Sequence, residues 1–134
     1  MFYFFSKKLK RRVKKSASTL AKEKLNRKKY LDNKERARAL ILQRLEHFNS
    51  FYNFKYNVVA VRNQKTRWGS CSSKGNLNFN YKILFLDSDL ADYIIVHELC
   101  HLKEMNHGAN FWQQVELQCP DYKLKMSRLR LIRL

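Results

Sequence analysis

Segment 88–103 constrains the fold of this chain more than any other, because a helical period of apolar residues leads directly into two histidines. The apolar run Tyr93-Ile94-Ile95-Val96 stands immediately before His97-Glu98-Leu99-Cys100-His101. This order predicts a helix that is buried where its histidines emerge. Buried imidazoles need polar or metal partners, so the rest of the chain has to build a polar site against this helix.

The spacing of the two histidines suits a shared metal ion. Residues four apart on a helix are neighbours, with roughly 5–6 Å between their Cβ atoms, so His97 and His101 can both reach one ion. Glu98 lies about 100° around the helix from His97, beside the ion, where it can take a proton from a water molecule. This H-E-x-x-H pattern is typical of zinc-dependent hydrolysis.

A catalytic zinc site needs a third protein ligand and one open position, and His107 is the first candidate. In an unbroken helix His107 would point about 240° away from the second histidine and lie ~9 Å along the axis. The prediction therefore requires the helix to stop between about residues 103 and 106, with Asn106 or Gly108 in left-handed geometry. In the alternative, His107 caps the next helix and Glu116 completes the site. We expect His107 rather than Glu116.

The remaining histidine and the cysteines are predicted to be structural. His47 falls on the polar flank of an earlier helix, beside Arg44 and Glu46. Cys100 lies about 100° before His101 on the helix, so it should face the packed interior rather than the metal. The cysteines are odd in number and match no disulfide framework, which favours a reducing compartment.

The sequence shows neither a membrane span nor a secretory signal. No apolar run approaches the ~20 residues that a membrane-spanning helix needs. Residues 1–5 are apolar and precede basic residues, whereas a secretory signal has its charges before its apolar core. We therefore expect a cytoplasmic protein that has no membrane partner.

Two further helical regions are expected besides the helix of the two histidines. Asp32 and Glu35 resemble a capping box, which predicts a helix that begins at Asp32 and has a core-facing stripe. That stripe comprises Ala37, Leu40, Ile41, Leu45, Phe48 and Phe51. In the C-terminal region, a helix is expected at about 109–118, ended by Cys119-Pro120, with a last short helix within 121–134.

Three short strands are expected between these helices. Residues 56–61 are rich in β-branched side chains, and residues 66–71 can form a second strand before a turn. In residues 77–82 apolar and polar side chains alternate, which indicates a half-buried antiparallel strand. Its Asn78 and Asn80 are expected to face solvent or to contact a ligand. We predict an α+β fold: a short, mostly antiparallel sheet, arranged as a small meander, packed on the histidine-bearing helix and flanked by N- and C-terminal helices.

The chain is strongly basic, with 28 Lys+Arg against 11 Asp+Glu and a net charge of +17. In its first part, Lys7–Lys15 is a basic block and Lys22–Lys29 adds more positive charge. We interpret residues 1–31 as a basic, partly helical arm docked loosely on a domain of residues 32–134. A positive field attracts phosphates, so nucleic acid is a candidate partner, while a solvated extension explains the arm equally well.

Several short motifs between residues 34 and 124 form a specific combination. They are Thr66-Arg67-Trp68-Gly69-Ser70-Cys71, Leu77-Asn78-Phe79-Asn80, Val96-His97-Glu98-Leu99-Cys100-His101-Leu102, Asn106-His107, Phe111-Trp112 and Cys119-Pro120-Asp121-Tyr122. This combination resembles the YgjP-like metallopeptidase domain, which is similar to the SprT and WLM groups of small zincins. The resemblance implies a zincin fold, a zinc ion and hydrolysis of peptide or protein substrates.

The resemblance also assigns roles to single residues. The family's ligand histidines carry over onto His97, His101 and His107, and its catalytic base carries over onto Glu98. The N-terminal part of the family is usually longer and rich in strands, whereas a short basic arm takes its place here.

Three functions follow as hypotheses from these residues. The first is metal-assisted hydrolysis of a peptide bond with Glu98 as general base and an extended peptide paired to the strand near Leu77–Tyr81. The second is a zinc-dependent nucleoside triphosphate pyrophosphatase, although the chain has no G-x-x-x-x-G-K-[ST] loop. The third is a nucleic-acid-binding module, or a protease acting on nucleic-acid-bound proteins. Arg67, Tyr81 and Tyr122 are candidates by chemistry for stabilising the oxyanion.

Overall fold

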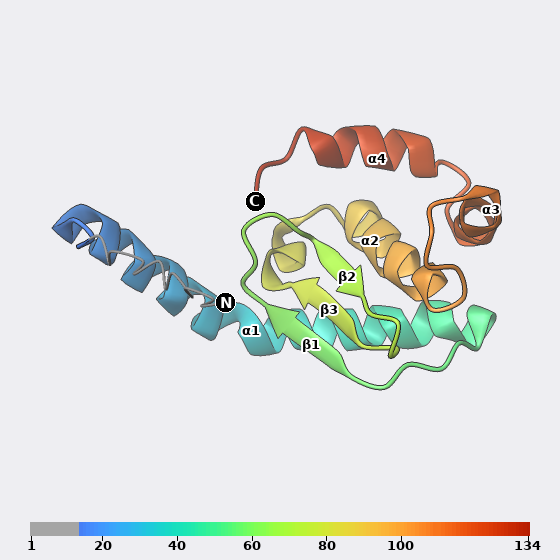
Figure 1. Ribbon diagram of the computed structural model, residues 1–134, viewed down its shortest axis with the longest axis horizontal. Helices are drawn as coiled ribbons and strands as arrows, with labels where there is room; N and C mark the ends of the chain where they lie inside the picture. Colours follow the sequence, from blue (N-terminus) through green and yellow to red (C-terminus); the bar gives the residue numbers. More distant parts are fainter. Residues whose placement is uncertain (1–13) are drawn as a thin grey trace, which may run out of the picture.

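The computed structural model describes residues 14–134 and confirms an α+β fold, in which helices pack against a small three-stranded sheet (Figure 1). In chain order the elements are α1 (Ala17–Tyr52), β1 (Val59–Arg62), β2 (Gly69–Cys71), β3 (Leu77–Asn80), the 3₁₀ helix η1 (Tyr81–Phe85), α2 (Ser88–His101), α3 (Ala109–Gln118) and α4 (Tyr122–Arg130). Residues 1–13, which include most of the basic block Lys7–Lys15, lie outside the described part of the chain. None of the helices that the structure describes carries an apolar stretch long enough to span a membrane.

Helix α1 begins much earlier than the sequence predicted. Its N-cap is Ser16, whose side-chain oxygen accepts a hydrogen bond from the backbone N–H of Thr19 at 3.3 Å. The predicted cap at Asp32 was therefore wrong, because Asp32 lies inside the helix and is exposed to solvent. Residues 17–31 are mostly good helix formers, so nothing local interrupts the helix. It ends at Tyr52 and is capped by Asn53, which adopts left-handed φ and ψ angles of 56° and 37°.

The second half of α1 packs against the domain. Its buried side chains are Ala37, Ile41, Leu45 and Phe48. They recur at spacings of three and four residues, as predicted, whereas Phe51 is 51% exposed and does not join the core. Arg44 on the same helix makes two hydrogen bonds of 2.6 and 2.8 Å to Asp92 of α2. Packing and charge together therefore fix α1 against α2.

The sheet has the strand order β1-β3-β2, so the predicted meander was wrong. Strand β3 pairs antiparallel with β2 but parallel with β1, where Val59 lies beside Leu77 and Arg62 beside Asn80. The chain leaves β1, forms β2 at the far edge and returns through the middle after a turn at Gly75, whose φ is 78°. The sheet is mixed rather than mostly antiparallel. Strand β3, which was expected to pair with a peptide, has a strand on each side.

Asn80 is fully buried, although the alternation of its strand predicted a side chain that faces solvent or a ligand. Its amide donates to the carbonyl of Gln64 at 2.7 Å and to that of Arg67 at 3.1 Å, and its Oδ1 accepts from the N–H of Lys82. A buried amide with these partners fixes the backbone around it. Asn80 therefore holds the loop between β1 and β2, which carries Arg67.

Helix α2 lies at the centre of the molecule, in contact with α1, β2, α3 and α4 (Figure 1). Its buried apolar residues are Leu90, Ala91, Tyr93, Ile94, Ile95, Val96, Leu99 and Cys100. It ends at His101, slightly before the predicted end near residue 103. Helix α3 has its predicted bounds and is followed by Cys119 and Pro120, while α4 falls inside the predicted range 121–134. The C-terminal end of α2 is thus framed by β2 on one side and by α3 and α4 on others.

Candidate active site

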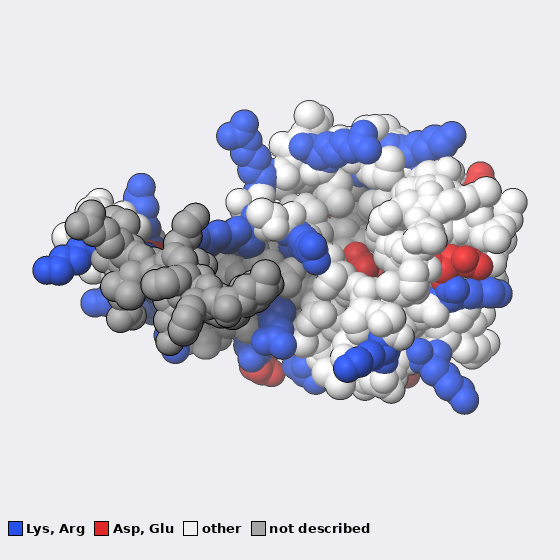
Figure 2. All heavy atoms as spheres, viewed as in Figure 1, with Lys and Arg blue, Asp and Glu red and all other residues white. Residues whose placement is uncertain are grey.

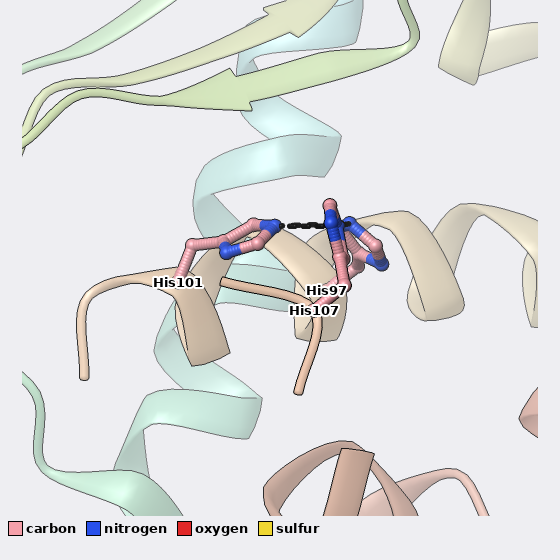
Figure 3. A group of neighbouring side chains, drawn as sticks. All are labelled: His97, His101 and His107. Carbon is pink, nitrogen blue, oxygen red and sulfur yellow. Dashed lines mark hydrogen bonds between the residues drawn. The ribbon is translucent and has the colours of Figure 1, made fainter. Parts of the chain in front are cut away.

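The end of α2 and the loop that follows it bring three imidazoles together (Figure 3). The Nε2 atoms of His97 and His101 lie 3.2 Å apart, and those of His101 and His107 lie 3.0 Å apart. The third distance, between His107 and His97, is 3.1 Å. Within residues 14–134, this is the one group of three or more His, Cys, Asp or Glu side chains placed closely enough to hold a metal ion.

His107 reaches the group because α2 stops at His101. The N–H groups of Lys103 and Glu104 both hydrogen-bond to the carbonyl of Cys100, at 3.2 and 3.0 Å. These bonds tighten the last turn of the helix. The chain then leaves the helix axis and returns His107 to the side that carries the other two rings (Figure 3).

The backbone of this loop differs from the prediction. We expected Asn106 or Gly108 to adopt left-handed geometry, but φ of Gly108 is −85°. Across residues 14–134, positive φ angles occur at Asn53 and Gly75 alone. The loop therefore turns with right-handed and extended backbone, and the conformational freedom of glycine is not what brings His107 to the site.

Hydrogen-bond partners outside the group orient two of the rings. His101 donates from Nδ1 to the carbonyl of Glu104 at 3.0 Å, so its neutral ring presents the lone pair of Nε2 to the group. Tyr93 places its hydroxyl 3.3 Å from Nδ1 of His97. Such partners fix the tautomer and direction of a metal-binding imidazole. Sequence reasoning missed Tyr93, although its position four residues before His97 on one helix face was an available signal.

Aromatic side chains pack against the imidazoles. Phe111 of α3 is fully buried and stacks on His101, with ring centroids 4.3 Å apart and planes at 21°. Trp112 lies nearly parallel to His107 at 5.9 Å, and Tyr122 in turn stacks on Trp112 at 4.8 Å. Close packing of this kind leaves the rings little freedom to rotate.

Glu98 lies against the edge strand β2 and is 6% exposed. The approach is closest at Gly69, where an added Cβ would lie 2.9 Å from Cγ and 3.0 Å from Oε1 of Glu98. The same Cβ would lie 3.2 Å from the carbonyl oxygen of Asn78. Glycine is therefore the residue that lets the strand and the carboxylate share this space. The sequence did not reveal this role, because it depends on which strand covers α2.

Burial changes the protonation of the site. It raises the pKa of Glu98 to about 8, and the guanidinium of Arg67 opposes part of that shift. Burial, together with the neighbouring His101 and His107, lowers the pKa of His97 to about 3. A neutral imidazole is the form that binds a metal ion, so this histidine is held in its metal-binding form.

Other residues singled out in the sequence lie away from the three imidazoles. Glu116, the alternative third ligand, is exposed on α3 and is not part of the group. His47 is exposed on α1, with its ring edge-on to Phe48. Cys100 is fully buried in the hydrophobic core, as predicted.

Among the three candidate oxyanion stabilisers, Arg67 adjoins the site. It lines a cavity of about 340 Å³ together with His97 and Glu98. Tyr81 is 1% exposed within the core and meets Tyr30 edge-on, so it is not available to a substrate. Tyr122 is engaged in its stack on the indole of α3.

The donor set fits a divalent metal such as zinc. Imidazole nitrogens bound to zinc at about 2.0–2.1 Å in tetrahedral geometry lie about 3.3 Å apart, close to the 3.0–3.2 Å that separate the three Nε2 atoms. The three Nε2 atoms cannot all be paired with one another by hydrogen bonds, because each neutral ring carries a single N–H group. A set of three imidazoles beside a cavity would suit a catalytic ion better than a structural one.

Comparisons with known proteins agree with this geometry. The family model described as YgjP-like, metallopeptidase domain matches residues 5–131. The structure is similar to that of the metallopeptidase zymogen abylysin of Pyrococcus abyssi, with 29% sequence identity, a TM-score of 0.61, and 66% of this chain and 90% of that chain covered. It is also similar to the metallopeptidase zymogen jannalysin of Methanocaldococcus jannaschii, with 27% identity, a TM-score of 0.51, and 72% and 97% covered. No curated protein sequence matches the chain.

Proposed function

Because this chain belongs to the YgjP-like metallopeptidase family, we propose that it is a zinc-dependent peptidase of the H-E-x-x-H type. The observation that carries the proposal is the group of three convergent imidazoles next to the buried carboxylate of Glu98. In this proposal, His97, His101 and His107 hold the zinc ion. Abylysin and jannalysin, two solved structures that resemble the chain, are each described as a metallopeptidase zymogen, which supports the same class of reaction.

The proposed reaction is hydrolysis of a peptide bond by water. A bound zinc ion supplies the positive charge that acidifies a nearby water and polarises the scissile carbonyl. In its ionised form, which the guanidinium of Arg67 favours, Glu98 accepts a proton from the attacking water and then delivers it to the nitrogen of the leaving amine. The contact with Gly69 limits the movement of the carboxylate during this exchange. Arg67 is the candidate to donate to the carbonyl oxygen as negative charge develops there.

We propose that an extended peptide binds along β2. This strand forms one edge of the sheet and passes over Glu98 at Gly69. An edge strand offers unpaired N–H and C=O groups to which a further strand can add. In this arrangement the peptide backbone runs beside the catalytic carboxylate, a position that the central strand β3 cannot provide.

Metal content tests the proposed ligands. Zinc is measured by mass spectrometry on wild-type protein and on His107→Ala, both purified without a chelating resin. We expect about one zinc per chain in the wild type and a sharp loss in the variant. Zinc retained in His107→Ala would move the third ligand elsewhere, with Glu116→Ala as the next variant. A wild type that takes up no zinc even after reconstitution would overturn the proposal.

The variant Glu98→Gln separates catalysis from metal binding. Because the amide cannot accept the proton of the attacking water, we expect peptide hydrolysis to fall by about 10²–10⁴-fold, while zinc content stays unchanged. Glu116→Gln is the matched control, since this exposed carboxylate lies outside the group. Loss of zinc together with activity in Glu98→Gln would assign Glu98 a structural role instead.

A second candidate function is binding of nucleic acid by the first part of α1. The basic residues of Lys22–Lys29 are exposed, and Figure 2 shows Lys and Arg side chains on this extension of the molecule. A row of cations on a helix binds phosphates without regard to base sequence. Such binding would bring the peptidase site to proteins that are associated with nucleic acid.

A further inference from the structure

A second cavity adjoins the active site on the side of the C-terminal segment. Its volume is about 550 Å³, and His97 and Glu98 form part of its wall. The rest of the wall comes from residues 65–69, from α2 and from residues 126–134. In Figure 1, α4 lies over α2, and the segment after α4 runs toward the loop between β1 and β2. A cavity of this size accommodates a large side chain with its flanking backbone.

The wall of this cavity is largely apolar. Its apolar and aromatic residues include Trp68, Tyr93, Ile94, Met126, Leu129 and Ile132. Tyr93 and Ile94 belong to the buried face of α2, whereas Met126 and Leu129 are presented by α4. A large apolar side chain bound here would leave water and gain binding free energy from its burial.

Ion pairs hold α4 in place over α2. Arg128 bonds to Asp87 at 3.0 Å and to Asp89 at 2.5 Å, and both carboxylates stand at the start of α2. The same guanidinium lowers the pKa of Asp89. Because Arg128 is fixed in this way, its neighbours on α4, Leu129 and Arg130, keep their positions at the cavity.

The charged side chains along this cavity, apart from Glu98, are all basic. They are Lys65, Arg67, Arg130 and Arg133, and each of these residues is exposed. Within the part of the chain that the structure describes, none of the four forms an ion pair with an acidic side chain. Their combined field attracts anionic ligands and repels cationic ones.

We infer that this site selects acidic peptides, in which a large apolar residue next to the scissile bond fills the cavity and carboxylates near it pair with the basic side chains. The inference rests on the proposed peptidase function, because the cavity borders His97 and Glu98. Arginine binds a carboxylate through two parallel hydrogen bonds, so the basic side chains would set the position of the peptide as well as its affinity. The carboxylates come either from Asp and Glu side chains or from the C-terminus of the peptide.

Binding of defined peptides tests this inference without turnover. Zinc-loaded Glu98→Gln protein is titrated with fluorescently labelled short peptides at roughly 0.15 M salt, where distant charges are screened. The parent peptide has one Phe flanked by Glu residues and an amidated C-terminus. Its variants carry Gln or Lys in place of Glu, or Ala in place of Phe. A further Gln variant with a free C-terminal carboxylate separates the two sources of negative charge.

We expect the Gln and Ala variants to bind at least about tenfold more weakly than the parent, and the Lys variant more weakly still. Recovery of affinity in the Gln variant with a free carboxylate would identify the peptide C-terminus as the preferred anion. Equal affinity for the Glu and Gln peptides would overturn the inference. The peptide series compares different peptides on one protein, whose basic and apolar cavity side chains are unaltered, so each peptide serves as a control for the others.

Charge reversal in the protein adds a matched comparison. In the protein carrying Arg130→Glu and Arg133→Glu, we expect the preference for the Glu peptide to disappear and the Lys peptide to gain affinity. The control protein carries Arg36→Glu and Arg62→Glu, two exposed positions that do not line the cavity. Circular dichroism checks that both proteins are folded. An equal loss of affinity in the control would assign the effect to overall charge and overturn the inference.

Hydrolysis of the same peptides by the wild type, followed by mass spectrometry, keeps the two proposals distinguishable. Charge-dependent binding without hydrolysis would reject the peptidase proposal and leave the acidic, apolar ligand assigned. Hydrolysis that is indifferent to the charge of the peptide would reject the acidic preference and leave the peptidase proposal intact.

Discussion

Helix α1 contains two stretches that share one backbone but are held in different ways. Residues 37–48 bury a stripe of apolar side chains, whereas residues 17–29 are all exposed. The change occurs at Tyr30, whose hydroxyl donates to the carbonyl of Val61 at 2.9 Å and whose ring meets Tyr81 edge-on at 5.4 Å. Figure 1 shows the exposed stretch extending beyond the sheet.

This difference shows that forming a helix and attaching it to a domain are separate properties of a sequence. The exposed stretch has good helix formers, the Ser16 cap and an ion pair between Lys15 and Glu23. An isolated helix of that length, with no tertiary packing, is only marginally stable in water. The packed stretch supplies an already formed helix end from which the exposed stretch continues, so we expect the exposed stretch to depend on the packed one, while the packed one does not depend on it.

Amide hydrogen exchange should show the largest difference between the two stretches. Amides in residues 37–48 should exchange through global unfolding, whereas those in residues 17–29 should exchange through local fraying. We expect protection to differ by at least about a thousandfold. Exchange measured on the full chain by mass spectrometry or NMR gives both values in one sample. Similar protection in the two stretches would break the comparison.

Truncation of one leucine in each stretch should give the next largest difference. Leu45 is fully buried and Leu25 is 67% exposed. We expect Leu45→Ala to lower the free energy of unfolding by about 2–5 kcal/mol because it leaves a cavity. Leu25→Ala should change it by less than about 0.5 kcal/mol. Urea denaturation measures both, and a comparable loss for Leu25→Ala would mean that the arm is packed in solution.

Replacing basic residues in the exposed stretch of α1 tests whether their positive charge binds nucleic acid. The altered residues are Lys22, Lys24, Arg27 and Lys28, each replaced by Gln. Each phosphate contact adds about 0.9 to the slope of log affinity against log salt for duplex DNA, so we expect that slope to flatten by up to about 3 to 4. The matched control replaces the exposed residues Lys55, Lys74, Lys103 and Lys123. An unchanged slope in the arm variant would count against the nucleic-acid candidate.

The ion pairs of the two stretches should give the smallest difference. Arg44 and Asp92 are partly buried, with side chains 29% and 21% exposed, and make two hydrogen bonds. Asp92→Asn should therefore lower the free energy of unfolding by about 1–2 kcal/mol. Glu23→Gln removes an exposed pair in the arm and should cost less than about 0.5 kcal/mol. Thermal melting at low and at high salt distinguishes the effects of the two substitutions, since salt weakens the exposed ion pair more than the partly buried one.

The sequence predicted the geometry of the candidate site well because that geometry is mostly local. The four-residue spacing places His97 and His101 on one helix face wherever the helix stands. An α-helix rotates by about 100° per residue, so the helix had to stop before His107 for that side chain to face the other two. The structure confirms such a stop, although at His101. The roles of these residues as ligands remain predictions that metal analysis can test.

The expectations that failed depended on contacts between distant parts of the chain. Alternation of side chains tells which faces of a strand are buried but not which strands lie beside it, so the central position of β3 was missed. The same limit hid the burial of Asn80, which bonds to a loop, and the contact of Gly69 with a helix. The pattern at Asp32 satisfies a capping rule, but residues before it continue the helix just as well, and the cap is not used.

The three imidazoles of the site belong to one short stretch of chain, residues 97–107. An ion bound there would close a loop of a few residues rather than join distant parts of the fold, so it adds little constraint to the unfolded chain. The core around Ile41, Phe79 and Ile95 includes none of these three histidines. Maturation in this chain would therefore be a two-stage process, in which folding comes first and metal loading follows. A chelator would then empty the enzyme reversibly while leaving its core intact.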